Sequence, residues 1–329
     1  MTKHVRILPS GHEFVSEGNS TLLEAGLSAG LALGYGCSNG NCGECLAKVV
    51  SGEVEKTTHH DYKVNDDHHI LMCCNTALSD VVLEAIEARD TSEIPQQHIT
   101  ANVKNIQVVN DNVALVHLKT PRTNRLRFLA GQYVQLGGND IPVADHSISS
   151  CPCDDMNLHF QIPRLPGDRF SDHVFNVIKK GDMVDVNGPC GNFVLDEKSD
   201  RPLVLIAWRT GFGPIKSLVE HALSLELTDC MRLVWIADNK NDRYLHNLCR
   251  SWEDALDDFS YIPVDTDTID GAVDVEQLIT KQLNIAPDIL ADYDFYIAGT
   301  NRLVDYCRDT LIEIGLPAEQ LTLDQIEHN

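Results

Sequence analysis

The stretch Cys37-Ser-Asn-Gly-Asn-Cys42-Gly-Glu-Cys45 carries the strongest signal in the chain. Its cysteines have the C-x4-C-x2-C spacing that plant-type [2Fe–2S] clusters use. Each iron of such a cluster takes two thiolates, and the glycines of the stretch let backbone N–H groups approach the sulfur atoms. A zinc site, the alternative, typically uses paired C-x2-C knuckles, and this chain has a single such pair. The spacing therefore predicts a [2Fe–2S] cluster that moves single electrons.

The fourth thiolate must come from a later segment, Ile70-Leu-Met-Cys-Cys-Asn75. Cys73 and Cys74 are adjacent there, and only one of them can point at the cluster. The strand expected near Val81 fixes the local geometry, but the residues alone leave the choice between the two cysteines open.

Length and charge restrict the class of protein. The chain has 329 residues, which predicts two or three domains. It carries 26 basic and 49 acidic residues, a net charge of -23. This charge disfavours binding to nucleic acid or an anionic membrane, and it suits docking to a partner protein with a basic face. The alternative is that the charge serves solubility alone.

The N-terminal segment contains no apolar signal region, and no apolar stretch is long enough to span a bilayer. We therefore expect a cytoplasmic protein without membrane insertion. With 11 cysteines, the absence of a signal region favours a reducing compartment over a disulfide framework.

Three regions with different patterns follow one another along the chain. Residues 1–90 alternate as strands around a short amphipathic helix, for which Ser20 is the expected N-cap and Glu24 its capping-box partner. Strands are expected at 3–8, 12–15, 46–50 and 81–83, which together with the helix make a small α+β unit. A polar linker follows at 90–97.

Residues 97–198 contain short strand-like runs at regular spacing, which predicts an antiparallel β-barrel. The runs are 99–108, 113–120, 132–136, 147–150, 157–162 and 183–186. From residue 199 to 329 strands alternate with helices, which predicts a parallel sheet with helices on both faces. The expected strands are 203–207, 232–237 and 295–298, and the expected helices are 215–225, 244–252 and 303–313.

The cysteine stretch, Ser20–Ala25 and Ser51–Glu55 together resemble the iron–sulfur flavoprotein reductases of the ferredoxin reductase superfamily. The pattern is most similar to CDP-6-deoxy-Δ3,4-glucoseen reductases and to the reductase components that feed bacterial oxygenases. The resemblance covers essentially the whole chain. It implies a β-grasp ferredoxin domain at 1–90, an FAD-binding β-barrel at 97–198 and a Rossmann-like NAD(P)-binding domain at 199–329.

The resemblance also implies an electron route and a fourth cluster ligand. Hydride from NADH passes to FAD, and single electrons pass to the cluster and out to a partner. In this family the fourth cysteine lies seven residues before the Asp of a Ser-Asp pair. That register selects Cys73, because Asp80 follows it at this distance.

Flavin contacts follow from three segments of the barrel. The Ala130–Tyr133 segment matches the strand beside the flavin, and Gly167–Ser171 matches the loop near the FAD phosphates. The family's Arg-x-Tyr-Ser motif appears as Ala144-Asp-His-Ser147, so the phosphate-binding arginine is absent. We expect His146 either to stack on the flavin or to be a structural histidine, and Ser147 to bond the flavin ring. The implied flavin residues are Gln132, Tyr133, His146, Ser147, Arg169, Phe170 and Ser171, with His146 and Ser147 nearest the catalytic centre.

The nucleotide motif departs further from the family. The expected Ala-Gly-Gly-Thr-Gly-x-x-Pro reads Ala207-Trp-Arg-Thr-Gly-Phe-Gly-Pro214, so Trp208 and Arg209 crowd the place where the backbone would approach the phosphates. Asp238 can accept from a ribose hydroxyl and would repel the extra phosphate of NADPH. The residues retained from the implied nucleotide site are Thr210, Gly211 and Pro214, with Asp238 beside them.

Two functions follow from these patterns. The first is an enzyme, an NADH-dependent oxidoreductase that passes electrons through FAD and the cluster to an oxygenase or dehydrase. The second is a degenerate subunit that keeps the cluster but has lost NAD(P)H binding. In the extreme case it has lost FAD binding as well. Such a subunit acts as an electron carrier or structural component. Cys151-Pro-Cys153 is interpreted as two loop thiols in preference to a redox pair.

Overall fold

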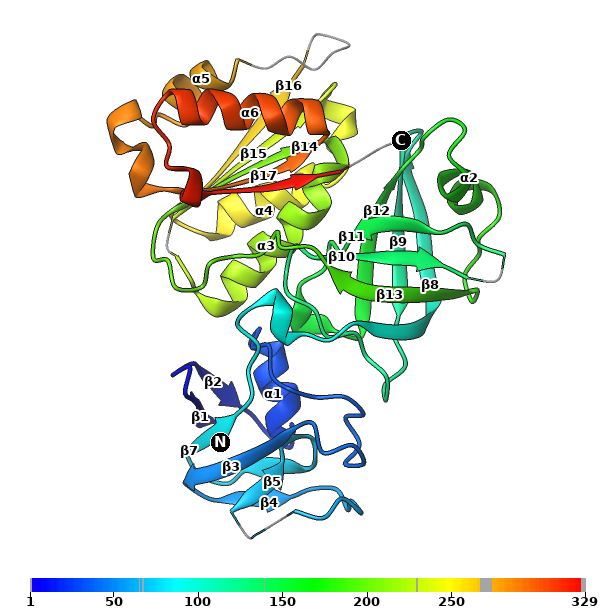
Figure 1. The fold of residues 1–329 in the computed structure, drawn as a ribbon, viewed down its shortest axis with the longest axis vertical. Helices are drawn as coiled ribbons and strands as arrows, with labels where there is room; N and C mark the ends of the chain where they lie inside the picture. Colours follow the sequence, from blue (N-terminus) through cyan, green and yellow to red (C-terminus); the bar gives the residue numbers. More distant parts are fainter. Residues whose placement is uncertain are drawn as a thin grey trace.

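The computed structural model describes residues 2–326 except 65, 67, 139, 229 and 267–273. The chain forms three units. The N-terminal unit lies at one end of the long axis, and the other two lie side by side at the opposite end (Figure 1). This arrangement has the predicted fold class, with one α+β unit, one antiparallel β-unit and one parallel α/β unit.

The N-terminal unit is a mixed sheet with one helix packed on it. Its elements are β1 (Lys3–Leu8), β2 (Glu13–Ser16), α1 (Leu22–Ser28), β3 (Leu46–Ser51), β4 (Val54–Lys56), β5 (His69–Leu71), η1 (Met72–Cys74), β6 (Asn75–Ala77), β7 (Val81–Ala85) and η2 (Thr91–Glu93). The strand order is β2-β1-β7-β3-β5, with β1 parallel to β7, and β4 pairs separately with β6. The helix buries Leu22, Leu23 and Leu27 against this sheet.

The second unit is a six-stranded antiparallel sheet that curls toward closure. Its elements are β8 (Gln97–Asn110), β9 (Val113–Lys119), β10 (Tyr133–Gly137), β11 (Ala144–Ser147), η3 (Pro152–Asp154), β12 (Asn157–Pro163), α2 (Arg169–Asn176) and β13 (Met183–Cys190). The strand order is β11-β10-β13-β8-β9-β12. Just beyond β11, the backbone N–H of Ser149 donates to the carbonyl of His159 in β12, which links the two ends of the order.

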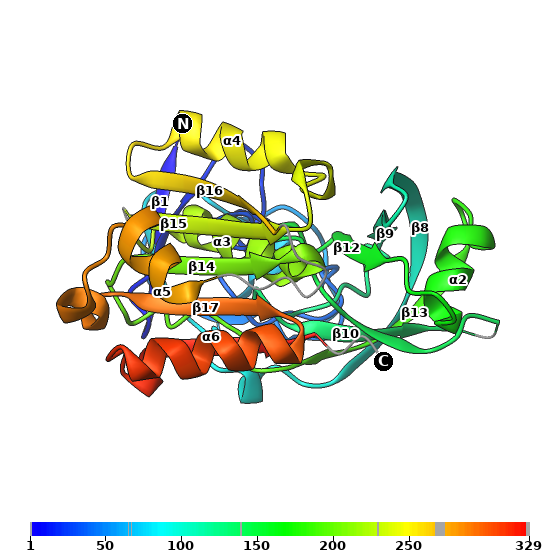
Figure 2. The ribbon, with the colours of Figure 1, turned by 90° about the horizontal axis from the view of Figure 1, so that it is seen from above.

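The third unit is a parallel sheet covered on both faces (Figure 2). Its elements are β14 (Leu203–Trp208), η4 (Arg209–Gly211), α3 (Phe212–Leu225), β15 (Met231–Ala237), η5 (Lys240–Asp242), α4 (His246–Ala255), β16 (Phe259–Asp265), α5 (Val275–Gln277), η6 (Leu278–Gln282), η7 (Pro287–Asp292), β17 (Asp294–Gly299), α6 (Asn301–Glu313), η8 (Ala318–Gln320) and β18 (Leu321–Gln325). The order is β16-β15-β14-β17-β18. Alternate residues of β14 pack against α3 and α4 on one face and against α5 and α6 on the other.

Several expected elements differ from those observed. Thr21, and not Ser20, caps α1, because the backbone N–H of Glu24 donates to Thr21 Oγ1 at 3.2 Å, the three-residue spacing of a capping box. The expected strand at 147–150 is instead β11 at Ala144–Ser147, because its pairing with β10 ends at Ser147. The strands β4, β5, β6, β16 and β18 were not predicted, since their short runs show little alternation.

Candidate cluster and flavin sites

The cysteine loop between α1 and β3 arranges its thiols in two pairs. Cys37 and Cys42 lie close together, since the Cys42 N–H donates to Cys37 Sγ at 3.2 Å and the Cys37 N–H donates to Cys42 Sγ at 3.3 Å. Cys45 at the start of β3 contacts Cys73 of η1, with 3.3 Å between the two sulfur atoms. A two-iron cluster takes two thiolates per iron, so this pairing fits a [2Fe–2S] cluster.

Two glycines give the loop its shape. Gly40 and Gly43 have φ values of +85° and +84°, which residues with a Cβ rarely adopt. A Cβ on Gly43 would lie 2.2 Å from the ring of Tyr62, and one on Gly40 would lie 2.8 Å from Cys74 Sγ. In this tight loop the backbone N–H groups point at sulfur. The Asn41 N–H, for example, donates to Cys37 Sγ at 3.3 Å. The residues present therefore fit the cluster.

The choice between the adjacent cysteines follows from these contacts. Cys73 is the residue that contacts Cys45, and the mutual hydrogen bond lowers the pKa of Cys45 to about 7 and raises that of Cys73. Cys74 is fully buried behind it, 3.6 Å from Cys73 Sγ. This geometry favours Cys73 as the fourth ligand.

A second site is a cavity of about 460 Å³ between the antiparallel and parallel units. Its size lies within the range of cofactor pockets. Two units share its wall, because β10, β11 and β12 face the start of α3 and the end of β18 across it. The lining includes Tyr133, Ala144, Asp145, His146, Ser147, Gln161, Asp168, Thr210, Gly213, Pro214, Asp324 and Ile326.

One hydrogen bond crosses this cavity. The hydroxyl of Ser147 in β11 donates to Asp324 Oδ2 of β18 at 3.3 Å. Burial raises the pKa of Asp324 to about 6, and the Ser147 hydroxyl opposes that shift. Asp324 was not among the sequence-predicted site residues.

His146 lies between the cavity and the core. Its ring packs against the ring of Phe170 from α2, with 4.7 Å between centroids and 35° between planes. The predicted flavin residues Tyr133, His146 and Ser147 therefore line one cavity, while Phe170 supports the histidine from behind.

Gln132 has a structural role in this arrangement. Its side chain accepts from the Leu129 N–H at 2.8 Å and donates to the Gly191 carbonyl at 3.1 Å. These bonds use both ends of the amide and attach the loop after β13 to the strand beside the cavity.

The expected phosphate loop differs from prediction. Asp168 caps α2 by accepting from the Ser171 N–H at 2.6 Å, and the buried Ser171 hydroxyl bonds Leu165 N and the Pro163 carbonyl. The backbone near Ser171 was expected to hold a pyrophosphate, but this N–H is already used by a carboxylate. Arg169 is exposed on the first turn of the helix and keeps its charge available.

The nucleotide turn η4 is occupied by its own side chains. Arg209 has a φ of +46° and its Nη2 donates to Asp238 Oδ1 at 2.7 Å. Trp208 is buried, and a Cβ on Gly299 would lie 2.7 Å from the Trp208 Cβ. Gly211 is required here, since a Cβ would meet the Ala298 carbonyl at 2.2 Å. Asp238 is thus paired with arginine, whereas the sequence predicted a ribose partner.

The remaining nucleotide residues lie beside the flavin cavity. Thr210 and Pro214 line it, and Thr210 is buried. The structure therefore brings three of the predicted flavin residues, Tyr133, His146 and Ser147, together with these two nucleotide residues. Asp238 lies apart from them, paired with Arg209 at the carboxyl end of β15.

Family models match the first two units. The 2Fe-2S iron-sulfur cluster binding domain matches residues 5–79, and the oxidoreductase FAD-binding domain matches residues 100–195. The chain therefore contains a [2Fe–2S] cluster-binding domain followed by an oxidoreductase FAD-binding domain, and its cofactors are a [2Fe–2S] cluster and FAD.

Particular relatives span nearly the whole chain. CDP-6-deoxy-L-threo-D-glycero-4-hexulose-3-dehydrase reductase of Yersinia pseudotuberculosis is 29% identical, covering 98% of both chains. Reductase component 2 of terephthalate 1,2-dioxygenase from Comamonas sp is 27% identical, covering 98% of this chain and 97% of the relative. The ferredoxin–NAD(P)(+) reductase component of the naphthalene 1,2-dioxygenase system from Pseudomonas putida is 24% identical, covering 97% of each.

Solved structures share the fold. The ferredoxin reductase of carbazole 1,9a-dioxygenase is similar with a TM-score of 0.60 and 23% identity, covering 99% of this chain and 98% of that one. A cytochrome P450 reductase from Amycolatopsis gives a TM-score of 0.63 at 22% identity, covering 98% of each. In the described part of this chain, no helix combines the length and apolarity needed to cross a bilayer.

Proposed function

We propose that this protein is the reductase component of a two-protein system, taking electrons from NADH and delivering them singly to an oxygenase or a dehydrase. The observation that carries the proposal is the pairing, in one chain, of four cysteines suited to a cluster with a cavity lined by Tyr133, His146 and Ser147. When bound, FAD and the cluster together convert a two-electron donor into a one-electron source.

The residues of the chain supply orientation and proton positions in this proposal. Ser147 and Asp324 hold one hydrogen-bonded proton in the wall of the cavity. Asp324 has a pKa of about 6 because it is buried, so near neutral pH it can exchange a proton with a neighbouring group. His146 packs at a tilt against Phe170 and also lines the cavity.

The proposed partner has a basic docking face. The chain carries 23 more acidic than basic residues, a surplus that attracts cationic surfaces at long range. The relatives named as reductase components of dioxygenases and of a dehydrase support a protein acceptor. A cytoplasmic location belongs to the same proposal, because NADH is its electron source.

An anaerobic absorption measurement tests the proposal. We expect the purified protein to show visible bands of both cluster and flavin, and NADH to bleach both. Bands of the cluster alone, with no change on adding NADH, would contradict it. A His146→Ala variant should keep the cluster bands and lose flavin affinity, which separates the two sites in one experiment.

A second function is favoured by the closed turn η4. The ion pair between Arg209 and Asp238 and the bulk of Trp208 occupy the place where a dinucleotide backbone would lie. In this alternative the chain is an electron carrier or structural subunit. It keeps the cluster, which receives its electrons from another protein. Reduction of the cluster by a reduced protein donor, with no reduction by NADH, would distinguish it.

A further inference from the structure

Cys151 and Cys153 form a disulfide in the structure, although the sequence favoured two free thiols. The other nine cysteines of the chain are free. A chain with so many free thiols is not organised by disulfides, so this bond needs a reason of its own.

The disulfide contributes little as a structural cross-link. It joins residues two positions apart, so it closes a loop of three residues. The stabilisation that a disulfide gives by restricting the unfolded chain grows with the length of the closed loop, and it is smallest for a loop this short. Ser150, just before the pair, is held independently of it, because Ser217 Oγ donates to the Ser150 carbonyl at 2.7 Å.

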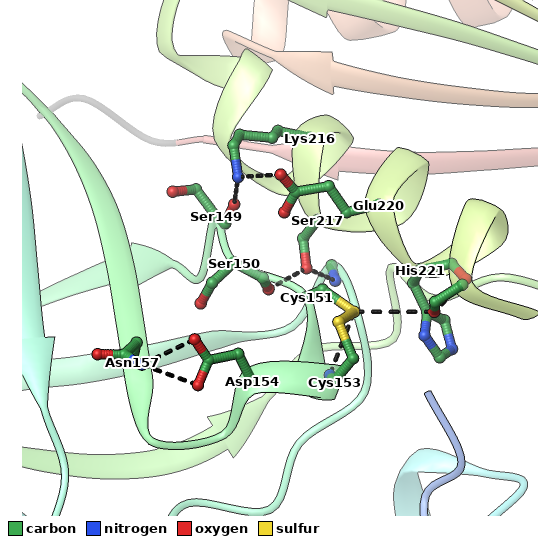
Figure 3. The surroundings of a disulfide bond; sticks show 12 residues. Ser149, Ser150, Cys151, Cys153, Asp154, Asn157, Lys216, Ser217, Glu220 and His221 are labelled. Atoms are coloured by element: carbon green, nitrogen blue, oxygen red, sulfur yellow. Dashed lines mark hydrogen bonds and ion pairs between the residues drawn. A yellow bond between two sulfur atoms is a disulfide. The ribbon is translucent and has the colours of Figure 1, made fainter. Parts of the chain in front are cut away.

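The bond lies where the three units meet (Figure 3). Its loop, η3, packs against α1 of the cluster unit and α3 of the nucleotide unit. Cys151 is buried, with its Sγ 3.9 Å from Ser224 Oγ of α3. The bond therefore sits in a position from which it can affect contacts between units.

A short path through η3 connects the two sites. Ser147 of the flavin cavity lies four residues before Cys151, and Asp155 lies two residues after Cys153. Asp155 accepts a hydrogen bond from the Tyr35 hydroxyl and forms a buried ion pair with Arg125 at 3.1 Å. Tyr35 lies two residues before the first cluster cysteine. The state of the disulfide thus bears on the contact that ties the cluster loop to the flavin unit.

The two sulfur atoms differ in access and in surroundings. Cys153 is partly exposed, whereas Cys151 is only 4% exposed. The Cys153 N–H donates to Cys151 Sγ at 3.1 Å, an interaction that stabilises a thiolate on Cys151. An incoming thiolate can therefore reach Cys153, with Cys151 as the stabilised leaving group.

We propose that Cys151 and Cys153 form a thiol–disulfide exchange site whose co-reactant is a dithiol, either a small molecule or a dithiol protein. A thiolate of the dithiol attacks Cys153 Sγ, the bond between the two cysteines breaks, and Cys151 leaves as a thiolate that takes up a proton. The second thiol of the co-reactant then attacks the mixed disulfide, which releases Cys153. The pair gains two electrons and two protons, and the dithiol becomes a disulfide.

The consequence is a redox-sensitive contact between units. With the bond open, the loop around η3 loses the cross-link between Cys151 and Cys153, two residues before Asp155. The hydrogen bond from Tyr35 to Asp155 then depends on a less restrained loop. Electron delivery to the cluster should become slower when the pair is reduced, because the cluster unit is held less firmly to the flavin unit.

Differential alkylation of the holoprotein tests the proposal. Free thiols are blocked with one alkylating reagent, the protein is treated anaerobically with a dithiothreitol series, and new thiols are labelled with a second reagent and mapped by mass spectrometry. We expect Cys151 and Cys153 to appear together in the second label, under native conditions, and to return to the disulfide after reoxidation. The visible bands of the cluster should stay constant, which excludes labelling that follows cluster loss.

Two outcomes would overturn the proposal. One is blocking of both cysteines by the first reagent in air-oxidised protein, which would mean that no bond exists. The other is a bond that opens only in denaturant, which would make it structural. Neither measurement uses NADH or FAD reduction. Failure of the thiol–disulfide proposal can therefore be distinguished from failure of the proposed function.

Hydrogen exchange gives a second readout with a matched control. Reduction of the pair should raise the exchange rate of the 33–37 and 152–156 peptides at least about threefold. Cys151→Ser should show the faster exchange with or without the dithiol. Cys230→Ser removes another partly exposed thiol away from the junction and should leave the response of the wild type unchanged. An unchanged exchange rate at both peptides on reduction would refute the coupling between the pair and the cluster loop.

Discussion

At the scale of single residues, two adjacent cysteines have different roles. Cys73 contacts Cys45, whereas Cys74 fills the space behind the loop, beside the position where Gly40 lacks a Cβ. We therefore propose that one peptide bond separates a cluster ligand, Cys73, from a packing residue, Cys74.

Serine at each of these positions tests this division. We expect Cys73→Ser to lose the cluster, because one iron would lack a thiolate, and Cys74→Ser to retain it with a modest loss of stability. Iron and acid-labile sulfide content per chain, measured beside the visible spectrum, distinguishes the two variants. A cluster lost in Cys74→Ser and kept in Cys73→Ser would reverse the assignment.

Asp324 gives a prediction for pH. Its folded pKa of about 6 lies above the ordinary value of 3.8, so the folded state holds a proton that the unfolded state has released. Stability should therefore fall as pH rises through this window, by about 1 kcal/mol between pH 5 and 7.5. The Asp324→Asn variant should flatten this part of the curve. Urea midpoints at several pH values, compared between wild type and variant, measure the difference, and identical slopes would contradict the assignment.

At the scale of elements, η4 carries an ion pair on the surface of the turn that joins a strand to a helix. The turn still joins β14 to α3, and Gly211 still permits close packing on β17. Arg209 adopts the left-handed region that a glycine would occupy without strain. The Arg209 side chain covers the surface of this turn through its pair with Asp238.

Restoring glycine at this turn should open it. We expect Arg209→Gly to tighten NADH binding about tenfold, close to 1.4 kcal/mol, because it frees Asp238 and exposes the backbone to the phosphates. The substitution should not destabilise the protein, since glycine suits this φ. Titration calorimetry with NADH measures the change. Arg122→Gly, which removes another exposed arginine, should leave affinity unaltered, and equal affinity in both variants would show that η4 is not the obstacle.

The start of α1 offers a test of local structure. Thr21→Ala removes the oxygen that accepts from the Glu24 N–H, and we expect a loss of about 1 kcal/mol. Ser20→Ala should have little effect, because its side chain caps nothing. Thermal unfolding of the two variants checks the assignment, and equal losses would show that the cap is shared.

At the scale of the whole molecule, the contact between units rests on few polar groups. Tyr35, Arg125 and Asp155 form one buried cluster between the N-terminal and antiparallel units. Burial raises the pKa of the Tyr35 hydroxyl, so it remains a donor across the physiological range. The docking of the cluster unit therefore depends on neighbouring residues of η3 as much as on apolar packing.

The net charge of -23 predicts how the molecule meets its acceptor. The rate of electron transfer to cytochrome c, a basic protein, should fall several-fold as ionic strength rises and screening shortens to about 8 Å near 0.15 M salt. The rate with ferricyanide, a small anion, should not fall in the same way. Stopped-flow rates over a salt series compare the two acceptors, and equal slopes would argue against a docking role for the charge.

The sequence by itself determined the cluster loop, the three-unit order and most strands and helices. Those features depend on local spacing and periodicity, which neighbouring residues express without distant partners. It also predicted flavin contacts for Tyr133, His146 and Ser147, and these three residues line one cavity.

Only the tertiary structure decided which distant residues meet. Arg209 and Asp238 are 29 residues apart, and Ser147 and Asp324 are 177 apart. Such pairs are set by sheet register and by the docking of units, which no local pattern encodes. The structure also decided the disulfide between Cys151 and Cys153, although these residues are only two positions apart in the sequence. Their sulfur atoms are held together because η3 folds between α1 and α3.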